Sequence, residues 1–237
     1  MRPARAAERS GIGQQLLAAV LFDFGGTLDG ALPWKERMFR LCRAEGVEVT
    51  PERFDPLFYR ADDALVGAIP DTLSLAETVR RLVAGLGAAL GLSDALVEHI
   101  ARRFVDDTTC AARDSIALLS ELARHYDLGL VSNFYGNLAR VCEDVGLRPL
   151  FGVIVDSAEV GWTKPDPRIF THALRTLGRK SREATFVGDS LPRDMAGARG
   201  IGMAHIWLAG ETATPPRPCC PDDRVIRSLG ELRELLL

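Results

Sequence analysis

The chain has 237 residues, a formal net charge of −3 and 47% hydrophobic residues. That length suffices for one α/β domain with an insertion or a small second domain. A charge this close to neutral provides no general attraction to nucleic acid or to an anionic membrane surface, and no apolar run reaches the ~20 residues that cross a bilayer. We therefore predict a globular protein that binds neither nucleic acid nor membranes.

The five cysteines are scattered and odd in number, which fits neither a secreted disulfide framework nor a zinc site. They are Cys42, Cys110, Cys142, Cys219 and Cys220. The leader over residues 1–17 lacks the apolar stretch of a secretory signal peptide and is predicted to be a flexible tail. These features predict a cytoplasmic protein with reduced thiols.

The first predicted element is a buried strand formed by the apolar run at residues 20–22. It ends in Asp23, and Gly25 and Gly26 follow almost at once. Paired glycines let backbone amides approach an anion closely, and ligands of open α/β sheets bind at the carboxyl ends of strands. Asp23 is therefore a candidate metal ligand or nucleophile. The alternative is a strand that ends in an ordinary turn, with Asp23 as a helix cap.

Residues 34–105 show helical patterns without a convincing strand. Pro51 stands where prolines open helices, and Ser93 is placed to cap a fourth helix that carries Ile100 and Phe104. Between them, apolar residues from Val79 to Leu90 recur at helical spacing. This much helix suffices for a small bundle with its own core.

From residue 114 onward the pattern alternates between helix and strand. Strands are predicted at 127–132, 152–155, 184–187 and 203–208, with helices between them, a proline-rich surface loop at 210–223 and a terminal helix. Such alternation predicts a parallel sheet with helices on both faces.

The helical block is an insertion, because one predicted strand precedes it and the others follow it. We predict an α/β fold: a Rossmann-like, three-layer core with a parallel sheet, formed by residues 18–31 and 109–237, and an inserted α-helical cap domain over residues 32–108. Both ends of the insertion return near Asp23, which places the cap to act as a lid.

Polar residues follow four of the predicted strands. They are Asp23, Ser132 with Asn133, Lys164 and Asp189. Since the carboxyl ends of parallel strands meet at one edge of a sheet, we expect these side chains to form one site. Taken singly, each has an ordinary structural explanation, such as a turn residue, a surface lysine or a helix cap.

The stretches that carry these residues resemble the motifs of the haloacid dehalogenase superfamily, in the branch with a helical cap between the first and second motifs. They are DFGGTL at 23–28, VSN at 131–133, KPDPRIF at 164–170 and GDSLPRD at 188–194. The resemblance covers most of the chain, and the last two motifs are long and specific.

The resemblance implies a role for each matching residue. Asp23 would be the nucleophile that forms an aspartyl-phosphate, and Asp23, Asp189 and the Gly25 carbonyl would bind Mg²⁺. Ser132, Lys164, Asn133 and the amides of Gly26 and Thr27 would bind the phosphoryl group, and Asp194 would orient the lysine or a metal-bound water. These roles agree with elementary chemistry, because an anionic nucleophile attacks an anionic phosphate only when cations offset the repulsion.

Position 25 departs from the pattern of phosphatases in this family. Most of them carry a second aspartate two residues after the nucleophile, which protonates the leaving oxygen and later activates water. Gly25 can do neither, and general acid–base groups contribute ~10²–10⁴-fold to rates. Asp29 and Glu36 are the nearest replacements in the sequence.

We predict a Mg²⁺-dependent phosphohydrolase that acts on a small phosphorylated metabolite, slowly or with good leaving groups only. A non-catalytic protein that binds a phosphate ligand is one alternative. The other is a 2-haloacid dehalogenase or a carbon–phosphorus hydrolase, since those relatives also lack the second aspartate. The intact acid Asp189 argues against a dehalogenase. A carbon–phosphorus hydrolase would need a lysine in the cap, for which only Lys35 is available. The cap would set the substrate, with Trp34, Arg37 and Phe58 as candidate contacts.

Overall fold

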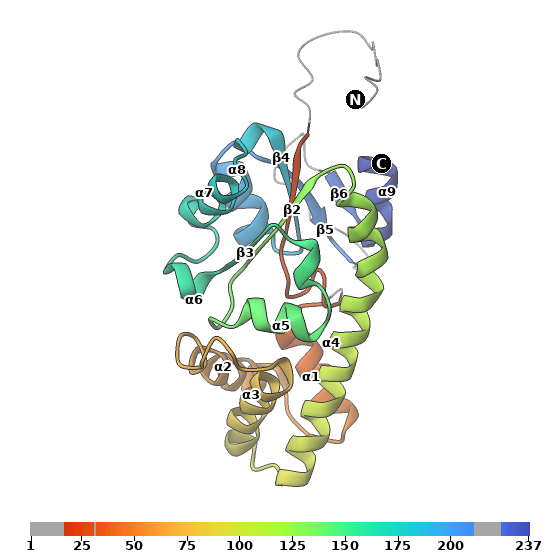
Figure 1. Cartoon of the computed structure of the whole chain (residues 1–237). Helices are drawn as coiled ribbons and strands as arrows, with labels where there is room; N and C mark the ends of the chain where they lie inside the picture. Colours follow the sequence, from red (N-terminus) through yellow and green to blue (C-terminus); the bar gives the residue numbers. More distant parts are fainter. Residues whose placement is uncertain (1–16, 31, 211–223) are drawn as a thin grey trace, which may run out of the picture.

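The computed structural model describes residues 17–30, 32–210 and 224–237. Within them, a six-stranded, wholly parallel sheet has the order β3–β2–β1–β4–β5–β6 (Figure 1). The strands are β1 (Ala19–Phe22), β2 (Asp127–Ser132), β3 (Val153–Asp156), β4 (Ala184–Gly188), β5 (Ala204–Leu208) and β6 (Arg224–Ile226). The predicted α/β fold with a parallel sheet is confirmed. Because β1 lies between β2 and β4, the residue after it stands at the middle of the sheet edge.

Helices cover both faces of the sheet, so the strand side chains alternate between two apolar cores. On one face, Val20 and Phe22 pack with residues of α4 (Asp94–Leu122), α5 (Leu138–Asp144) and α9 (Leu232–Leu236). On the other, Ala19 and Leu21 pack with α7 (Pro167–Thr176) and α8 (Ala196–Gly200). Burial on both sides explains why the strands read as near-continuous apolar runs.

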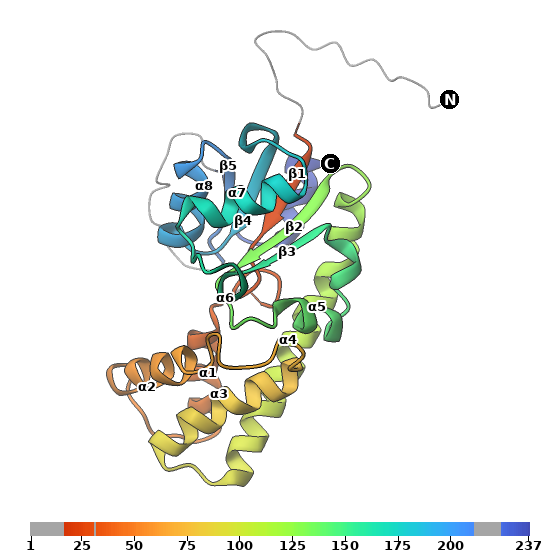
Figure 2. The same cartoon turned by 60° about the vertical axis from the view of Figure 1, so that its left-hand side comes forward.

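The remaining long helices lie beyond the carboxyl edge of the sheet (Figures 1 and 2). They are α1 (Trp34–Ala44), α2 (Pro51–Asp63) and α3 (Leu75–Leu90), and α3 packs along the first half of α4. Met38, Phe54 and Leu82 are fully buried among them. Their core is continuous with the core on one face of the sheet, so these helices pack against the part of the chain that carries Asp23.

Helix α4 differs from the sequence prediction, which placed two helices in its range. It is one helix of 29 residues, capped by Ser93, whose Oγ accepts a hydrogen bond from the Leu96 amide at 3.4 Å. Its sequence contains no glycine or proline that would break it. The residues on either side of the predicted boundary at 108/109 therefore lie in the same helix.

Two further differences concern the second half of the chain. The predicted helix near 194–199 has two parts, the π-helical turn η3 (Leu191–Met195) and α8. Strand β6 was not predicted, because its three residues form a strand only by pairing with β5. The predicted leader, up to residue 16, and residues 211–223 of the predicted loop, which include Cys219 and Cys220, lie outside the described residues.

In the part of the chain that the structure describes, no helix combines the length and apolar character needed to span a membrane. α4 has the length, but it carries charged residues along its whole course. This agrees with the short apolar runs of the sequence.

A pair of glycine substitutions in α8 tests how tightly the helix packs on α7. A Cβ at Gly197 would lie 2.3 Å from Phe170 Cε2, whereas a Cβ at Gly200 would meet nothing within 4 Å. We expect Gly197→Ala to lower the free energy of unfolding by about 1–3 kcal/mol through overpacking. Gly200→Ala should change it little or raise it by about 0.5 kcal/mol. Urea denaturation of both variants measures the difference, and equal effects would contradict this packing.

Candidate active site

The polar residues predicted at strand ends meet at the carboxyl edge of the sheet. Asp23 follows β1, Ser132 ends β2, Asp189 follows β4, and Lys164 lies between α6 (Ser157–Val160) and α7. Ser132 Oγ donates a hydrogen bond to Asp23 Oδ1 at 2.8 Å, and Lys164 Nζ lies 2.6 Å from the same oxygen. The predicted convergence of these side chains is thus present in the structure.

Lys164 occupies the centre of this arrangement. Its buried ammonium lies 2.6 Å from Asp23 Oδ1 and 2.7 Å from Asp194 Oδ1. Burial alone would lower the pKa of Lys164, but the Asp194 and Asp23 carboxylates outweigh it and raise that pKa above its ordinary value. Lys164 is therefore a cation at any pH near neutrality.

Three carboxylates gather around that single ammonium. Ligand oxygens of Asp23, Asp189 and Asp194 lie within 4.8 Å of one another. Burial, followed by the charges of Asp23 and Asp194, raises the pKa of Asp189. A cluster with more carboxylates than cations, all donating hard oxygen atoms, is the kind of site that a divalent cation such as Mg²⁺ fits.

Two glycines let the carboxylates pack directly against the backbone. A Cβ at Gly26 would lie 2.6 Å from Asp189 Oδ2, and a Cβ at Gly188 would lie 2.4 Å from Asp194 Oδ2. Asp194 is fully buried, and its Oδ2 accepts the Ser190 amide at 3.0 Å. Asp194 is thus itself held in place, and its other oxygen contacts the Lys164 ammonium at 2.7 Å.

Asn133 holds the backbone of Lys164. Its Oδ1 accepts from the Lys164 amide at 2.7 Å, and its Nδ2 donates to the Lys164 carbonyl at 3.2 Å. Both ends of the amide side chain are used in this way. Asn133 therefore positions the lysine, in addition to lining the cavity described below.

In the loop after β1, the backbone amides that are free to bind a phosphoryl group are not the ones that the sequence predicted. The Gly26 amide donates to Asp29 Oδ1 at 2.8 Å, and the Thr27 amide donates to the Phe24 carbonyl at 3.1 Å. Neither N–H is thus free for a phosphoryl group. Among the described residues, the Phe24 and Gly25 amides make no hydrogen bond, and they directly follow Asp23.

A cavity of about 460 Å³ opens over this edge and reaches the helices beyond it. Asp23, Gly25, Ser132, Asn133 and Lys164 form its floor, whereas Gly26 and Thr27 do not line it. Two of the predicted contacts, Trp34 and Phe58, line it as well. It is the cavity that contains the nucleophile candidate.

The third predicted contact, Arg37, belongs to a buried network around Asp29 that the sequence did not reveal. Asp29 is fully buried; its Oδ2 accepts from Trp34 Nε1 and lies 3.2 Å from Arg37 Nη1. Arg37 Nη2 donates to Thr108 Oγ1 in α4 at 2.7 Å. Asp29 thus ties the loop after β1 to α1 and α4, and it does not line the cavity.

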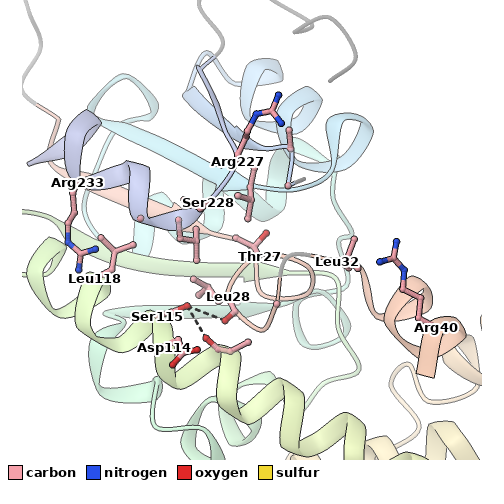
Figure 3. A pocket seen from close by; sticks show the side chains of 17 residues that line it. Thr27, Leu28, Leu32, Arg40, Asp114, Ser115, Leu118, Arg227, Ser228 and Arg233 are labelled. Carbon is pink, nitrogen blue, oxygen red and sulfur yellow. Dashed lines mark hydrogen bonds between the residues drawn. The ribbon is translucent and has the colours of Figure 1, made fainter. Parts of the chain in front are cut away.

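A larger cavity, of about 820 Å³, lies on another side of the loop after β1 (Figure 3). Leu28, Ser115 and Leu118 line it together with Arg227 and Arg233, and Ser115 Oγ donates to the Leu28 carbonyl at 3.3 Å. It contains none of the carboxylates of the acidic cluster. We therefore assign the active site to the smaller cavity on chemistry rather than on size.

The pH dependence of stability tests the environment of Asp29. Burial raises its pKa from 3.8 to about 6. Between these values the folded state binds more protons than the unfolded chain, so the contribution of Asp29 to stability falls as pH rises. Relative to Asp29→Asn, the wild type should lose about 2 kcal/mol of unfolding free energy between pH 4 and pH 6. Glu36→Gln, at a partly exposed carboxyl, is the control. A difference in unfolding free energy between the wild type and Asp29→Asn that stays constant over this pH range would contradict the prediction.

The comparisons with known proteins agree with this geometry. The family of haloacid dehalogenase-like hydrolases matches residues 17–202. Haloacid dehalogenase-like hydrolase domain-containing protein 3 of Homo sapiens is 30% identical, over 84% of this chain and 85% of its own. Pyrimidine 5'-nucleotidase YjjG of Escherichia coli is 33% identical, over 52% of this chain and 55% of its own.

A solved structure extends the likeness across the fold. The HAD phosphatase from Thermococcus onnurineus superposes with a TM-score of 0.59 and 25% identity, over 92% of this chain and 97% of its own. The sequence motifs, the family match over most of the chain and the human relative all point the same way. The chain belongs to the haloacid dehalogenase-like hydrolases.

Proposed function

We propose that the protein is a Mg²⁺-dependent phosphohydrolase that transfers the phosphoryl group of a small phosphorylated metabolite to Asp23. The observation that carries this proposal is the contact of Lys164 with Asp23 at 2.6 Å inside a cluster of three carboxylates. Such a site pairs a carboxylate nucleophile with the cations that an anionic substrate requires. The similarity to a pyrimidine nucleotidase and to a phosphatase structure supports the same class of reaction.

The chain's own residues divide the work of the reaction. Oδ1 of Asp23 is occupied by Ser132 and Lys164, whereas Oδ2 accepts no hydrogen bond from any described residue, so Oδ2 is the attacking atom. Lys164 and Ser132 would bind phosphoryl oxygens, together with the free amide of Gly25, a residue that lines the cavity. Mg²⁺, held by Asp23, Asp189 and the Gly25 carbonyl, would neutralise phosphoryl charge.

The helices between β1 and β2, over residues 32–108, form the cap in this proposal. Hydrogen bonds tie them to the core next to the cavity. The Gly67 amide donates to the Tyr135 carbonyl at 3.0 Å, and Asn137 Nδ2 donates to the Leu73 carbonyl at 2.8 Å. A cap in this position shields the site from water and contributes the walls that select the substrate.

Substitutions at positions 23 and 25 test the nucleophile and the missing acid. Asp23→Asn should abolish metal-dependent hydrolysis. Gly25→Asp should raise kcat/KM for an alkyl phosphate, because it adds a general acid in the loop that carries the nucleophile. The site has room, since a Cβ at Gly25 would lie 3.7 Å from Trp34 Cδ1. Gly25→Ala is the matched control and should not raise the rate.

The same assays decide between the proposal and its alternatives. A wild type that binds phosphate analogues but hydrolyses no phosphate ester with Mg²⁺ would be a binding protein. Release of halide from a 2-haloacid without Mg²⁺ would identify a dehalogenase. A screen of phosphate esters and phosphoanhydrides with the wild type is therefore the first experiment.

Accumulation of the aspartyl-phosphate would show that its hydrolysis, the second half of the reaction, is slow. Without an aspartate at position 25 to activate water, hydrolysis of the aspartyl-phosphate should lag behind its formation with an activated aryl phosphate. Rapid quenching and mass spectrometry should then find one phosphoryl group on Asp23 in a large fraction of the wild type and in much less of Gly25→Asp. Absence of the adduct during turnover would contradict a slow second half-reaction.

A further inference from the structure

The geometry of phosphoryl transfer restricts where a proton donor can stand. The attacking and leaving oxygens lie roughly in line on opposite sides of phosphorus. Asp23 attacks from the floor of the cavity, so the leaving oxygen faces the wall opposite the sheet edge. That wall is formed in part by α2, which lies beyond the edge (Figure 2), and by the segment after β2.

We propose that Asp62, near the carboxyl end of α2, is the general acid and base that replaces the missing side chain at position 25. This inference rests on the proposed phosphohydrolase function. Asp62 lines the same cavity as Asp23 and is half-buried there. Tyr135 Oη donates a hydrogen bond to its Oδ1, which fixes the carboxyl. Among the described residues, nothing donates to its Oδ2, the oxygen free to carry and deliver a proton.

The surroundings of Asp62 raise the pKa of its carboxyl above the ordinary value. Burial raises its pKa, and the charge of Asp63 adds to this effect. The hydrogen bond from Tyr135 and the charge of Arg193, which also lines the cavity, act in the opposite direction without cancelling it. A carboxyl with a raised pKa suits a residue that must donate a proton near neutral pH and then accept one.

The other candidate donors are engaged elsewhere. Asp29 does not line the cavity and accepts from Gly26, Trp34 and Arg37. Glu36 also lies outside the cavity, where it pairs with Arg40 at 2.8 Å.

Two further groups that do line the cavity are also excluded. Lys35 is held by Asp55 at 2.6 Å. Burial raises the pKa of Tyr135 well above its ordinary value, and its hydroxyl proton is directed at Asp62. Besides the nucleophile Asp23, Asp62 is therefore the carboxyl of the described cavity lining that is both held in place and partly desolvated.

The two half-reactions balance with this assignment. In the first, Asp23 Oδ2 forms a bond to phosphorus, the bond from phosphorus to the alcohol oxygen breaks, and Asp62 gives its proton to that oxygen. In the second, Asp62 takes a proton from water, the water oxygen bonds to phosphorus, and the bond to Asp23 breaks. Phosphate leaves, and Asp23 and protonated Asp62 are regenerated.

The test compares Asp62→Asn with Asp63→Asn, its exposed neighbour on the same helix and beside the same cavity. The readout is kcat/KM for an alkyl phosphate and for 4-nitrophenyl phosphate, whose leaving group needs no proton. Asp62→Asn should lower the alkyl value by about 10²-fold or more while changing the aryl value only a few-fold. In the pH profile of kcat/KM for the alkyl phosphate, Asp62→Asn should also lose the decline at high pH, because that decline reports deprotonation of the general acid. Asp63→Asn removes a charge that helps to raise the pKa of Asp62 but leaves its carboxyl in place, so it should change both values by a few-fold at most.

Two additional measurements separate a catalytic from a structural effect. After the initial burst of nitrophenol, Asp62→Asn should turn over 4-nitrophenyl phosphate more slowly than the wild type does, because the second half-reaction loses its base. Adding Gly25→Asp to Asp62→Asn should restore alkyl hydrolysis by at least 10-fold. Asp62→Asn and the double variant should both have the same urea midpoint of unfolding as the wild type.

The outcomes distinguish this inference from the proposed function. Equal losses for both substrates, no loss for either, or the same selective loss in Asp63→Asn would overturn the role of Asp62 and leave the phosphohydrolase in place. A wild type without any hydrolysis of phosphate esters would overturn both.

Discussion

The ion triad formed by Lys164 between Asp23 and Asp194 is the interaction on which the rest of the site depends. All three groups are buried, and the lysine nitrogen lies within 2.7 Å of an oxygen of each acid. Charges removed from water are costly unless they are paired, and loss of one partner from a buried pair typically costs about 3–5 kcal/mol. The core therefore keeps a cation beside Asp23 whether or not a substrate is present, which is the arrangement that an anionic substrate needs.

Much of the chain around the triad serves to hold it. β1 is central in the sheet, so Asp23 is flanked by β2 on one side and β4 on the other. Asn133 fixes the backbone of Lys164, and Gly188 lets the Asp194 carboxylate lie against β4. Each of these contacts comes from a different βα unit. The site is thus assembled by the parallel topology, and no single segment of the chain could form it alone.

The sequence predicted the residues of the floor but not the contacts around it. A polar residue directly after a buried apolar run marks a strand end, and that local signal was enough to find Asp23, Ser132 and Asp189. The Asp29 network has no such signal, because Thr108 meets Arg37 only through packing of α1 on α4. The polar stretch around Thr108 therefore resembled a boundary between two helices, whereas it lies within one helix, where Thr108 accepts a hydrogen bond from Arg37 of α1.

The position of Asp62 has a consequence for how the two parts of the molecule would cooperate. An acid at position 25 belongs to the same loop as the nucleophile and is present whatever the helices do. An acid on α2 is present only while α2 lies over the sheet edge, and Tyr135, from the core, is the residue that fixes it there. Chemistry would then require contact between the helices and the core, so hydrolysis would be confined to the state in which water is excluded.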